Sequence, residues 1–376
     1  MALGEHAAFQ IARSMSSLAK WTLPSPIKTF TPPGWALRAL IVNAGNANAG
    51  TGQPGLNAAR STCAAVGELI GCAPEEVLPF STGVIMEPLP VDRIVSALPS
   101  AQSAARADGW FAAALAIMTT DTVPKGASRR VIVDGVPITV TGIAKGSGMI
   151  HPDMATMLSF MATDAPIAPD VLTTIAREVA DESFNCATVD GDTSTNDSFV
   201  IASTGRVPIT PLRTMADARV KAIREAIEQV AVTLAQAIVR DGEGATKFIE
   251  VRVDGGRSVD ECRRVAFGIA HSPLVKTAMF ASDPNLGRIV CAIGNSTPSD
   301  LDPAQVSFWL EDVLVVERGG RAPTYREEDG QRVMKQDEIM VRVDLGRASG
   351  PTAPHGTVWT CDLSHEYVSI NADYRS

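Results

Sequence analysis

The chain has 376 residues, of which 45% are hydrophobic and 20% are charged, and its formal net charge is −9. This composition is that of a globular protein with room for two domains of about 150 residues each. The negative charge argues against a nucleic-acid-binding protein. Because no apolar run reaches about 18 residues, we expect no membrane-spanning helix and no membrane partner.

The cysteines indicate a reducing compartment. They are dispersed and form no C-x-x-C pair, so we expect neither a disulfide framework nor a zinc or other metal site, and we predict a cytoplasmic protein. The first 38 residues are poor in acids and contain Arg13, Lys20 and Lys28, which makes organelle targeting the alternative. The six cysteines are Cys63, Cys72, Cys186, Cys262, Cys291 and Cys361.

Two apolar runs in the first third of the chain lead into small, polar residues. Residues 39–42 predict a short strand, and "NAGNANAGTGQPG" after it predicts an irregular loop whose small side chains allow close backbone approach. The run at 77–80 ends in Ser81-Thr82-Gly83. Thr82-Gly83 is either a tight turn after a strand or an oxyanion hole, in which glycine offers an unobstructed N–H and threonine a hydroxyl.

A predicted hairpin leads to Lys145. Residues 131–133 and 136–140 read as strands joined by the Asp134-Gly135 turn. Lys145 follows directly. It is either a solvated loop lysine or an ammonium that binds a substrate carboxylate.

Thr156 lies between a glycine-rich loop and an apolar run. "KGSGMIHPDMAT" precedes "MLSFMATDA", which predicts a buried strand. If the Ala155-Thr156 peptide bond were cut, Thr156 would carry a hydroxyl and an α-amine whose pKa is near 8, suited to a general base. Such a residue is an amino-terminal nucleophile. The alternative is a loop-to-strand junction without chemistry.

Three polar segments contain acids and hydroxyls, and two of them resemble a calcium loop or a phosphate-binding loop without matching it. "VDGDTSTNDS" fails as a calcium loop because Thr195 and Ile201 stand where glycine and glutamate are required. "DGEGATK" lacks the spacing of a phosphate-binding loop. "MTTDTVPK", at 118–125, is dense in hydroxyls and acids, which polar turns also explain. Glu243 is either a charge near a helix end or a ligand for an amino group.

The second half of the chain predicts mixed α/β structure. Apolar residues at 220, 223, 227, 230, 234 and 238 predict an amphipathic helix. Residues 248–254, 340–343 and 358–361 read as strands and 259–267 as a helix. A strand-like stretch at 367–370 approaches the end of the chain. We place a domain boundary near residue 256.

From residue 39 to the end, the chain resembles the ornithine acetyltransferase family, the bifunctional glutamate N-acetyltransferases of arginine biosynthesis. The motifs that carry the resemblance occur in one order. The residues that depart from it are Asp153, Leu286 and Ser376, where asparagine, tryptophan and threonine are usual. The motifs are "NAGNANAGTG", "STGVI", "MTTDTVPK", "KGSGMIHPDMATML", "VDGDTSTNDS", "DGEGATKFIEV", "SPLVKTA", "DPNLGR" and "NADYRS".

The resemblance implies an αββα-layered sandwich of the amino-terminal-nucleophile kind over residues 1–256. A smaller C-terminal α/β domain over 257–376 would supply a tail that closes on the substrate. Self-cleavage between Ala155 and Thr156 would give α and β chains in an α2β2 heterotetramer. Thr156 would be the nucleophile, with Thr82 and Gly83 as the oxyanion pair. Substrate-binding positions would be Thr119, Lys145, Thr156, Glu243, Asn371 and Ser376.

The implied reaction moves the acetyl group from N2-acetyl-L-ornithine to L-glutamate through an acetyl-Thr156 intermediate, without a cofactor. The sequence leaves open whether acetyl-CoA is a second donor. One rival is a self-processing aminopeptidase or amidase with an N-terminal threonine, in which water accepts the acyl group. Another is a non-catalytic relative, against which intact Thr156, Lys145 and Thr82-Gly83 argue.

Overall fold

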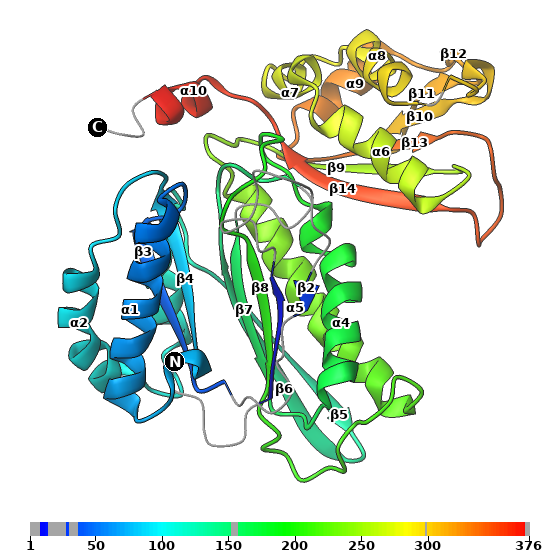
Figure 1. Cartoon of the computed structure of the whole chain (residues 1–376). Coiled ribbons are helices and arrows are strands. Elements are labelled where there is room, and N and C mark those ends of the chain that lie inside the picture. The colour runs from blue at the N-terminus through cyan, green and yellow to red at the C-terminus, as the bar shows by residue number, and fades with distance from the viewer. Residues whose placement is uncertain (1–7, 14–27, 30–36, 152–156, 298, 373–376) are drawn as a thin grey trace. The chain divides into compact units, whose positions relative to one another are not determined.

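The computed structural model describes residues 8–13, 28–29, 37–151, 157–297 and 299–372 (Figure 1). Ala155, Thr156 and Ser376 therefore lie outside the described residues. The chain divides into two compact units, Met1–Asn185 with Asp192–Ile238, and Cys186–Gly191 with Val239–Ser376. The boundary near residue 256 falls within the second unit, and the division of roles between two domains stays a prediction. None of the helices described is long and apolar enough to cross a membrane.

A six-stranded sheet forms the centre of the first unit. Its order is β2-β1-β8-β7-β6-β5, and its neighbours are antiparallel except for the parallel pair β7 and β8. The predicted turn joins β5 to β6, because Asp134 and Gly135 both adopt the positive φ that a two-residue hairpin needs. The strands are β1 (Ala8–Arg13), β2 (Lys28–Thr29), β5 (Lys125–Val133), β6 (Val136–Lys145), β7 (Leu158–Thr163) and β8 (Ser198–Ser203).

A second, two-stranded sheet pairs β3 (Ala39–Asn46) with β4 (Val77–Val84) in parallel. Parallel neighbours need a crossover connection, which α1 (Gly52–Ile70) supplies. Apolar residues of α1 and α2 (Val91–Ala104) pack with Ala39 and Val77 on one side of this small sheet.

The two sheets of the first unit pack face to face. Phe80 of β4 meets Phe160 of β7 edge to face, with 5.0 Å between ring centroids, inside an apolar cluster that also holds Ile143 and Val200. Edge-to-face aromatic pairs add to the stabilisation that buried area gives. The opposite face of the large sheet carries α4 (Pro169–Glu182) and α5 (Ala218–Arg240). The layers are thus helix, sheet, sheet and helix, which confirms the predicted αββα sandwich (Figure 1).

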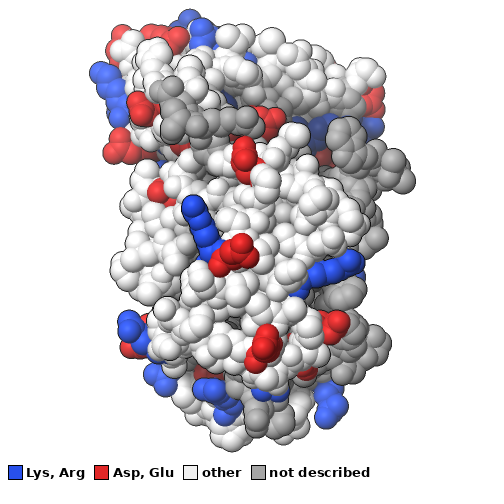
Figure 2. All heavy atoms as spheres, turned by 60° about the vertical axis from the view of Figure 1, so that its left-hand side comes forward, with Lys and Arg blue, Asp and Glu red and all other residues white. Residues whose placement is uncertain are grey.

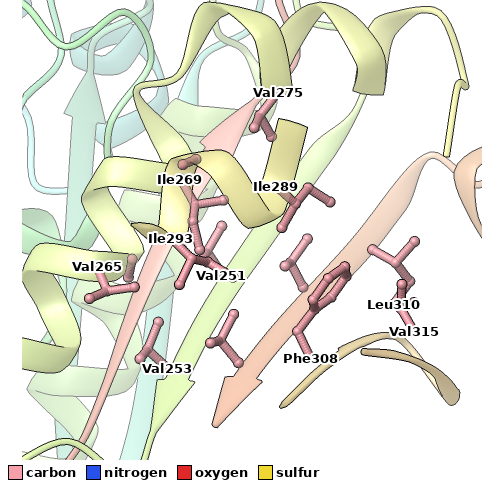
Figure 3. Packing of buried hydrophobic residues seen from close by; sticks show 14 of the residues in the cluster. Val251, Val253, Val265, Ile269, Val275, Ile289, Ile293, Phe308, Leu310 and Val315 are labelled. Atoms are coloured by element: carbon pink, nitrogen blue, oxygen red, sulfur yellow. The ribbon is translucent and has the colours of Figure 1, made fainter. Parts of the chain in front are cut away.

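The second unit holds another six-stranded sheet, ordered β12-β11-β10-β13-β9-β14. Figure 3 shows side chains of α6 and α8, such as Val265 and Ile293, directed at Val251 and Val253 of β9 in its apolar core. The elements are α6 (Val259–Ala270), α7 (Pro273–Phe280), α8 (Leu286–Ser296), α9 (Glu327–Met334), α10 (His365–Ala372), β9 (Phe248–Asp254), β10 (Ser307–Leu310), β11 (Val313–Glu317), β12 (Gly320–Arg321), β13 (Glu338–Asp344) and β14 (His355–Cys361).

Several elements differ from the sequence-based expectations. Of the loop expected over residues 43–55, residues 47–51 are irregular as predicted, whereas residues 43–46 continue β3. Helix α1 begins at Gly52, and its first turn holds Pro54, a position where the missing proline N–H costs little. The stretch 367–370 is helical in α10 rather than strand-like, because Ser364 Oγ accepts the N–H of Tyr367 and caps the helix start. Strands β1 and β2 lie within the first 38 residues, the segment for which organelle targeting is the alternative. The remaining helices are α3 (Trp110–Ala116) and the short 3-10 turns Pro74–Glu76, Phe184–Cys186 and Pro303–Gln305.

The surface shown in Figure 2 is largely uncharged. On this face, which brings forward the side of α1 and α2 in Figure 1, Lys and Arg are interspersed with Asp and Glu. This visible face therefore presents no continuous area of one charge sign.

Candidate active site

Lys145 is the last residue of β6, and its side chain contacts two threonines that are distant in the sequence. Its Nζ donates to Thr82 Oγ1 over 3.0 Å and to Thr119 Oγ1 over 2.9 Å. Lys145 is 3% exposed and Thr82 is 4% exposed. A lysine is rarely buried unless its charge is compensated and its hydrogens are bonded. Three of the predicted site residues thus share one buried hydrogen-bond network.

Asp121 supplies the negative charge of this network. Its Oδ1 accepts from Lys125 Nζ at 2.7 Å and from the Gly146 N–H at 2.8 Å. Its Oδ2 accepts the Thr119 N–H at 3.1 Å and lies 4.0 Å from Lys145 Nζ. Burial disfavours ionisation of Asp121, but Lys125, Lys145 and these hydrogen bonds outweigh it and hold the pKa of the carboxyl below its usual value.

The network brings buried groups of both charge signs together. Lys125 and Lys145 contribute two ammonium groups and Asp121 one carboxylate, and all three side chains are at most 3% exposed. A buried ammonium group is suited to bind an anionic partner, for example the carboxylate of an amino acid.

Lys145 also sets the orientation of the Thr82 hydroxyl group. An ammonium group can only donate hydrogen bonds, so Thr82 Oγ1 accepts from Lys145 and its own hydrogen is directed elsewhere. A hydroxyl that already accepts a charge-assisted hydrogen bond is a stronger donor. The arrangement therefore makes Thr82 suited to stabilise a developing oxyanion.

Gly83 is a position where only glycine fits. Its φ is +129°, and an added Cβ would lie 2.3 Å from Gly45 C and 2.6 Å from Asn46 N. The close approach of β3 and β4 at this point therefore requires a glycine next to Thr82. This placement agrees with the small residues that the sequence provides on both strands.

Asparagine side chains hold the polar loop that follows β3. Asn43 Nδ2 donates to Asn46 O at 2.8 Å, and Asn46 Nδ2 donates to Glu87 O and Pro88 O. Ser81 Oγ donates to Asn43 Oδ1 at 2.6 Å. The asparagine-rich composition thus has a structural use, since amides replace the ladder hydrogen bonds where the strand pairing becomes irregular.

Met157 brings the chain from the predicted cleavage position into the sheet. Its side chain is buried, and its N–H donates to Asp197 Oδ1 at 2.9 Å. Its carbonyl oxygen accepts the N–H of Ser198 at 3.0 Å. The residue that directly follows Thr156 is thus anchored at the start of β7.

The second unit contains a separate group of predicted site residues. Glu243 is 7% exposed, and its Oε2 accepts from Asn371 Nδ2 at 2.8 Å. Asn371 Nδ2 also donates to Tyr367 O within α10. Gly244 has φ +67°, and a Cβ there would lie 2.4 Å from Tyr367 N, so this loop passes close beneath α10. The structure therefore joins Glu243 to Asn371.

Sequence reasoning missed the residues that support these groups. Asp121 and Lys125 lie in the "MTTDTVPK" segment, and Asn196 and Asp197 lie in "VDGDTSTNDS", both of which polar turns explain equally well. The signal that could have found them is the density of acids and hydroxyls next to buried strands. Among the described residues, no three of His, Cys, Asp and Glu are grouped so that they could hold a metal ion.

The chain matches one family model and is similar to solved structures. The ArgJ family model matches residues 27–376. The crystal structure of arginine biosynthesis bifunctional protein ArgJ from Bacillus halodurans is 35% identical, with a TM-score of 0.53 over 57% of this chain and 97% of that chain. Ornithine acetyltransferase from Mycobacterium tuberculosis, complexed with ornithine, is 24% identical, with a TM-score of 0.27 over 40% of this chain and 95% of that chain.

Proposed function

The chain belongs to the ArgJ family, the acetyltransferases of arginine biosynthesis, and we propose that it moves the acetyl group of N2-acetyl-L-ornithine to L-glutamate. In this proposal Thr156 is the nucleophile and is liberated by self-cleavage after Ala155. The observation that supports it best is the buried Lys145 ammonium bonded to the hydroxyls of Thr82 and Thr119. These side chains provide a charge for a substrate carboxylate and a polarised donor for an oxyanion.

Self-cleavage begins with attack of Thr156 Oγ on the Ala155 carbonyl carbon. The C–N bond breaks, the new α-amine takes the hydroxyl proton, and an ester joins Ala155 to Thr156. Water then hydrolyses this ester and leaves a free α-amine and a free hydroxyl on the same residue. The α-amine has a pKa near 8 in the absence of perturbation, which suits a general base at neutral pH.

Acetyl transfer then proceeds in two half-reactions. The α-amine accepts the hydroxyl proton while Thr156 Oγ attacks the acetyl carbon. The tetrahedral oxyanion accepts hydrogen bonds from Thr82 and the Gly83 N–H, where one donor contributes about 3 kcal/mol to barrier lowering. The C–N bond breaks and ornithine leaves with the proton on its amine. Glutamate then attacks the ester with its α-amine and restores the hydroxyl, so ping-pong kinetics are expected.

The proposal also covers the assembly and the location of the protein. Self-cleavage at Ala155-Thr156 would give an α and a β chain, which we propose remain together as an α2β2 heterotetramer. None of the six cysteines, all of which the structure describes, forms a disulfide, and the proposal of a reducing, cytoplasmic location rests on their dispersed pattern in the sequence. Whether acetyl-CoA also serves as donor is decided by the assay below.

The test combines intact mass spectrometry with transfer assays. Wild-type protein should give two fragments, the second beginning at Thr156, and should acetylate glutamate from N-acetylornithine. Thr156→Ala should stay a single chain without transfer. Thr82→Ala should lower kcat by roughly tenfold to a thousandfold with a smaller change in KM. Thr233→Ala changes an exposed threonine whose hydroxyl donates to Gln229 O of its own helix, and it is the matched control.

Each alternative gives a different result. Efficient cleavage of purified Thr156→Ala would exclude self-processing by this residue. Release of free acetate, or hydrolysis of a peptide without acetylated glutamate, would favour an aminopeptidase or amidase. Acetylation of glutamate by acetyl-CoA in the absence of N-acetylornithine would identify a second donor.

A further inference from the structure

The segment "VDGDTSTNDS" is not used by the mechanism above, yet two of its residues bond to the backbone of Ser81 and Met157, the sequence neighbours of Thr82 and Thr156. We propose that Asn196 and Asp197 are positioning residues that fix Thr156 relative to Thr82 and Gly83 of β4. Asn196 bonds to the backbone beside Thr82, and Asp197 bonds to the backbone beside Thr156. The inference rests on the proposed function, since it takes Thr156 as the nucleophile and Thr82-Gly83 as the oxyanion pair.

Asn196 bonds to the loop after β3 and to strand β4. Its Nδ2 donates to Ala47 O, after the end of β3, at 2.6 Å, and to Ser81 O, within β4, at 2.9 Å. Both amide hydrogens are used, because a carbonyl oxygen can only accept. The Thr195 hydroxyl donates to Asn196 Oδ1 and sets the amide in this orientation. Asn196 is thus a bridge between the loop after β3 and the residue that precedes Thr82.

Asp197 holds the peptide group that follows Thr156. Its side chain is buried, and its Oδ1 accepts the Met157 N–H at 2.9 Å. The N–H of the next residue, Ser198, donates to the Met157 carbonyl. Because a peptide group is planar, an anchor on the Met157 N–H restricts the plane that also contains the Thr156 carbonyl.

The two contacts act together because the residues are neighbours. Consecutive Cα atoms are about 3.8 Å apart, so Asn196 and Asp197 cannot move independently by much. The dipeptide therefore links the proposed nucleophile and oxyanion donors through two side chains and one peptide bond. Attack on a carbonyl depends strongly on such spacing, since a displacement of about 1 Å can cost about a hundredfold in rate.

Four variants test the pair, with the rate of self-cleavage, kcat, KM and Tm measured for each. Asn196→Ala removes both donors, and the nearly isosteric Asn196→Asp places an oxygen against two carbonyls. Asp197→Ala removes the acceptor for Met157, whereas Asp197→Asn keeps an oxygen there. Asn57→Ala, an exposed asparagine on α1, is the control.

We expect Asn196→Ala to lower kcat about tenfold to a hundredfold with KM changed less than about threefold. Asn196→Asp should be at least as slow, Asp197→Asn should be faster than Asp197→Ala in both cleavage and transfer, and Asn57→Ala should match wild type. Wild-type kcat in Asn196→Asp would overturn the proposal, as would equal losses in Asp197→Asn and Asp197→Ala. If kcat falls only in variants whose Tm also falls, Asn196 and Asp197 act on stability alone, and this result would overturn the proposal as well.

The controls separate this inference from the proposed function. A wild-type protein that is cleaved but does not transfer acetyl groups would overturn the proposed reaction, while the cleavage rates of the four variants would still test the pair. If the wild-type protein is cleaved and transfers acetyl groups, and the four variants do so at wild-type rates, only the positioning role is overturned.

Discussion

At the scale of single residues, the first unit depends on one buried charge cluster. Asp121 faces Lys125 and Lys145 and accepts two backbone N–H groups. Removing one partner of a buried pair is strongly destabilising, because it leaves a charge without compensation. Asp121 therefore both stabilises the fold and holds the lysine that contacts Thr82.

We predict that Asp121→Asn loses about 3–5 kcal/mol of unfolding free energy at pH 7. The pKa of Asp121 is lowered in the folded protein, against the opposing effect of burial, by its lysines and hydrogen bonds. A lowered folded pKa means that the stabilisation is fully present above the unfolded pKa of about 3.9 and disappears as pH falls through the folded pKa. Denaturant titrations of wild type and Asp121→Asn between pH 7 and pH 3 measure this difference in unfolding free energy and its dependence on pH.

The control for this prediction is Asp170→Asn, an exposed aspartate at the start of α4. Its unfolding free energy should stay within about 0.5 kcal/mol of wild type at pH 7. A difference between wild type and Asp121→Asn that persists unchanged at pH 3 would contradict the role of the ionised carboxylate.

At the scale of elements, the large sheet of the first unit is fitted closely to α5. Gly142 of β6 leaves room for that helix, since a Cβ there would lie 2.6 Å from Met161 Cγ, 3.1 Å from Leu234 Cδ1 and 3.3 Å from Val230 Cγ1. Leu234 and Val230 belong to the apolar face of α5 that the sequence periodicity predicts. The glycine thus sets the distance between strand and helix.

We predict that Gly142→Ala lowers the unfolding free energy by about 1–2 kcal/mol, because overpacking outweighs the smaller entropy loss of alanine on folding. Gly126 on the neighbouring strand β5 is the matched control, since its added Cβ would meet no atom closer than 3.8 Å. Gly126→Ala should be neutral or stabilise by up to about 1 kcal/mol. Urea denaturation measures the unfolding free energy of both variants. Equal losses of unfolding free energy in Gly142→Ala and Gly126→Ala would exclude close packing as the cause.

At the scale of the whole molecule, helix α10, which precedes the last four residues, is bonded to the core of the second unit. Helix α10 carries Asn371, whose side chain bonds to the buried Glu243. A chain end is usually dispensable unless it is tied down by such contacts. The residues after Ala372 lie outside the described part of the chain.

We predict that removal of residues 371–376, or Asn371→Ala alone, raises KM for both N-acetylornithine and glutamate, since the proposed mechanism binds both in one pocket. Lost contacts of about 1–3 kcal/mol correspond to a rise of roughly 5- to 150-fold. Self-cleavage should be unaffected, because it depends on Thr156. Asn295→Ala, an exposed asparagine of the same unit, is the control. Wild-type KM for both substrates in a processed truncated enzyme would contradict the role of Asn371 and Ser376.

Local sequence patterns were sufficient for elements whose stability comes from one periodic face or one turn. The helix at 220–238, the hairpin at Asp134-Gly135 and the strands at 158–163 and 248–254 are present as predicted. The helix α1 was missed because glycine and proline at its start read as a loop, and α10 was mistaken for a strand because its short apolar run has no clear period.

For the site, the sequence by itself determined the motifs that place the chain in its family and the residues that such a family would use. It also determined that glycine stands at position 83 and a lysine at 145. Only the tertiary structure decided that Lys145 meets Thr82 and Thr119, that Asp121 compensates two lysines, and that Asn196 and Asp197 bond to Ser81 and Met157. The physical reason is distance along the chain: these partners are up to 115 residues apart, and their contacts exist only once the two sheets have packed face to face.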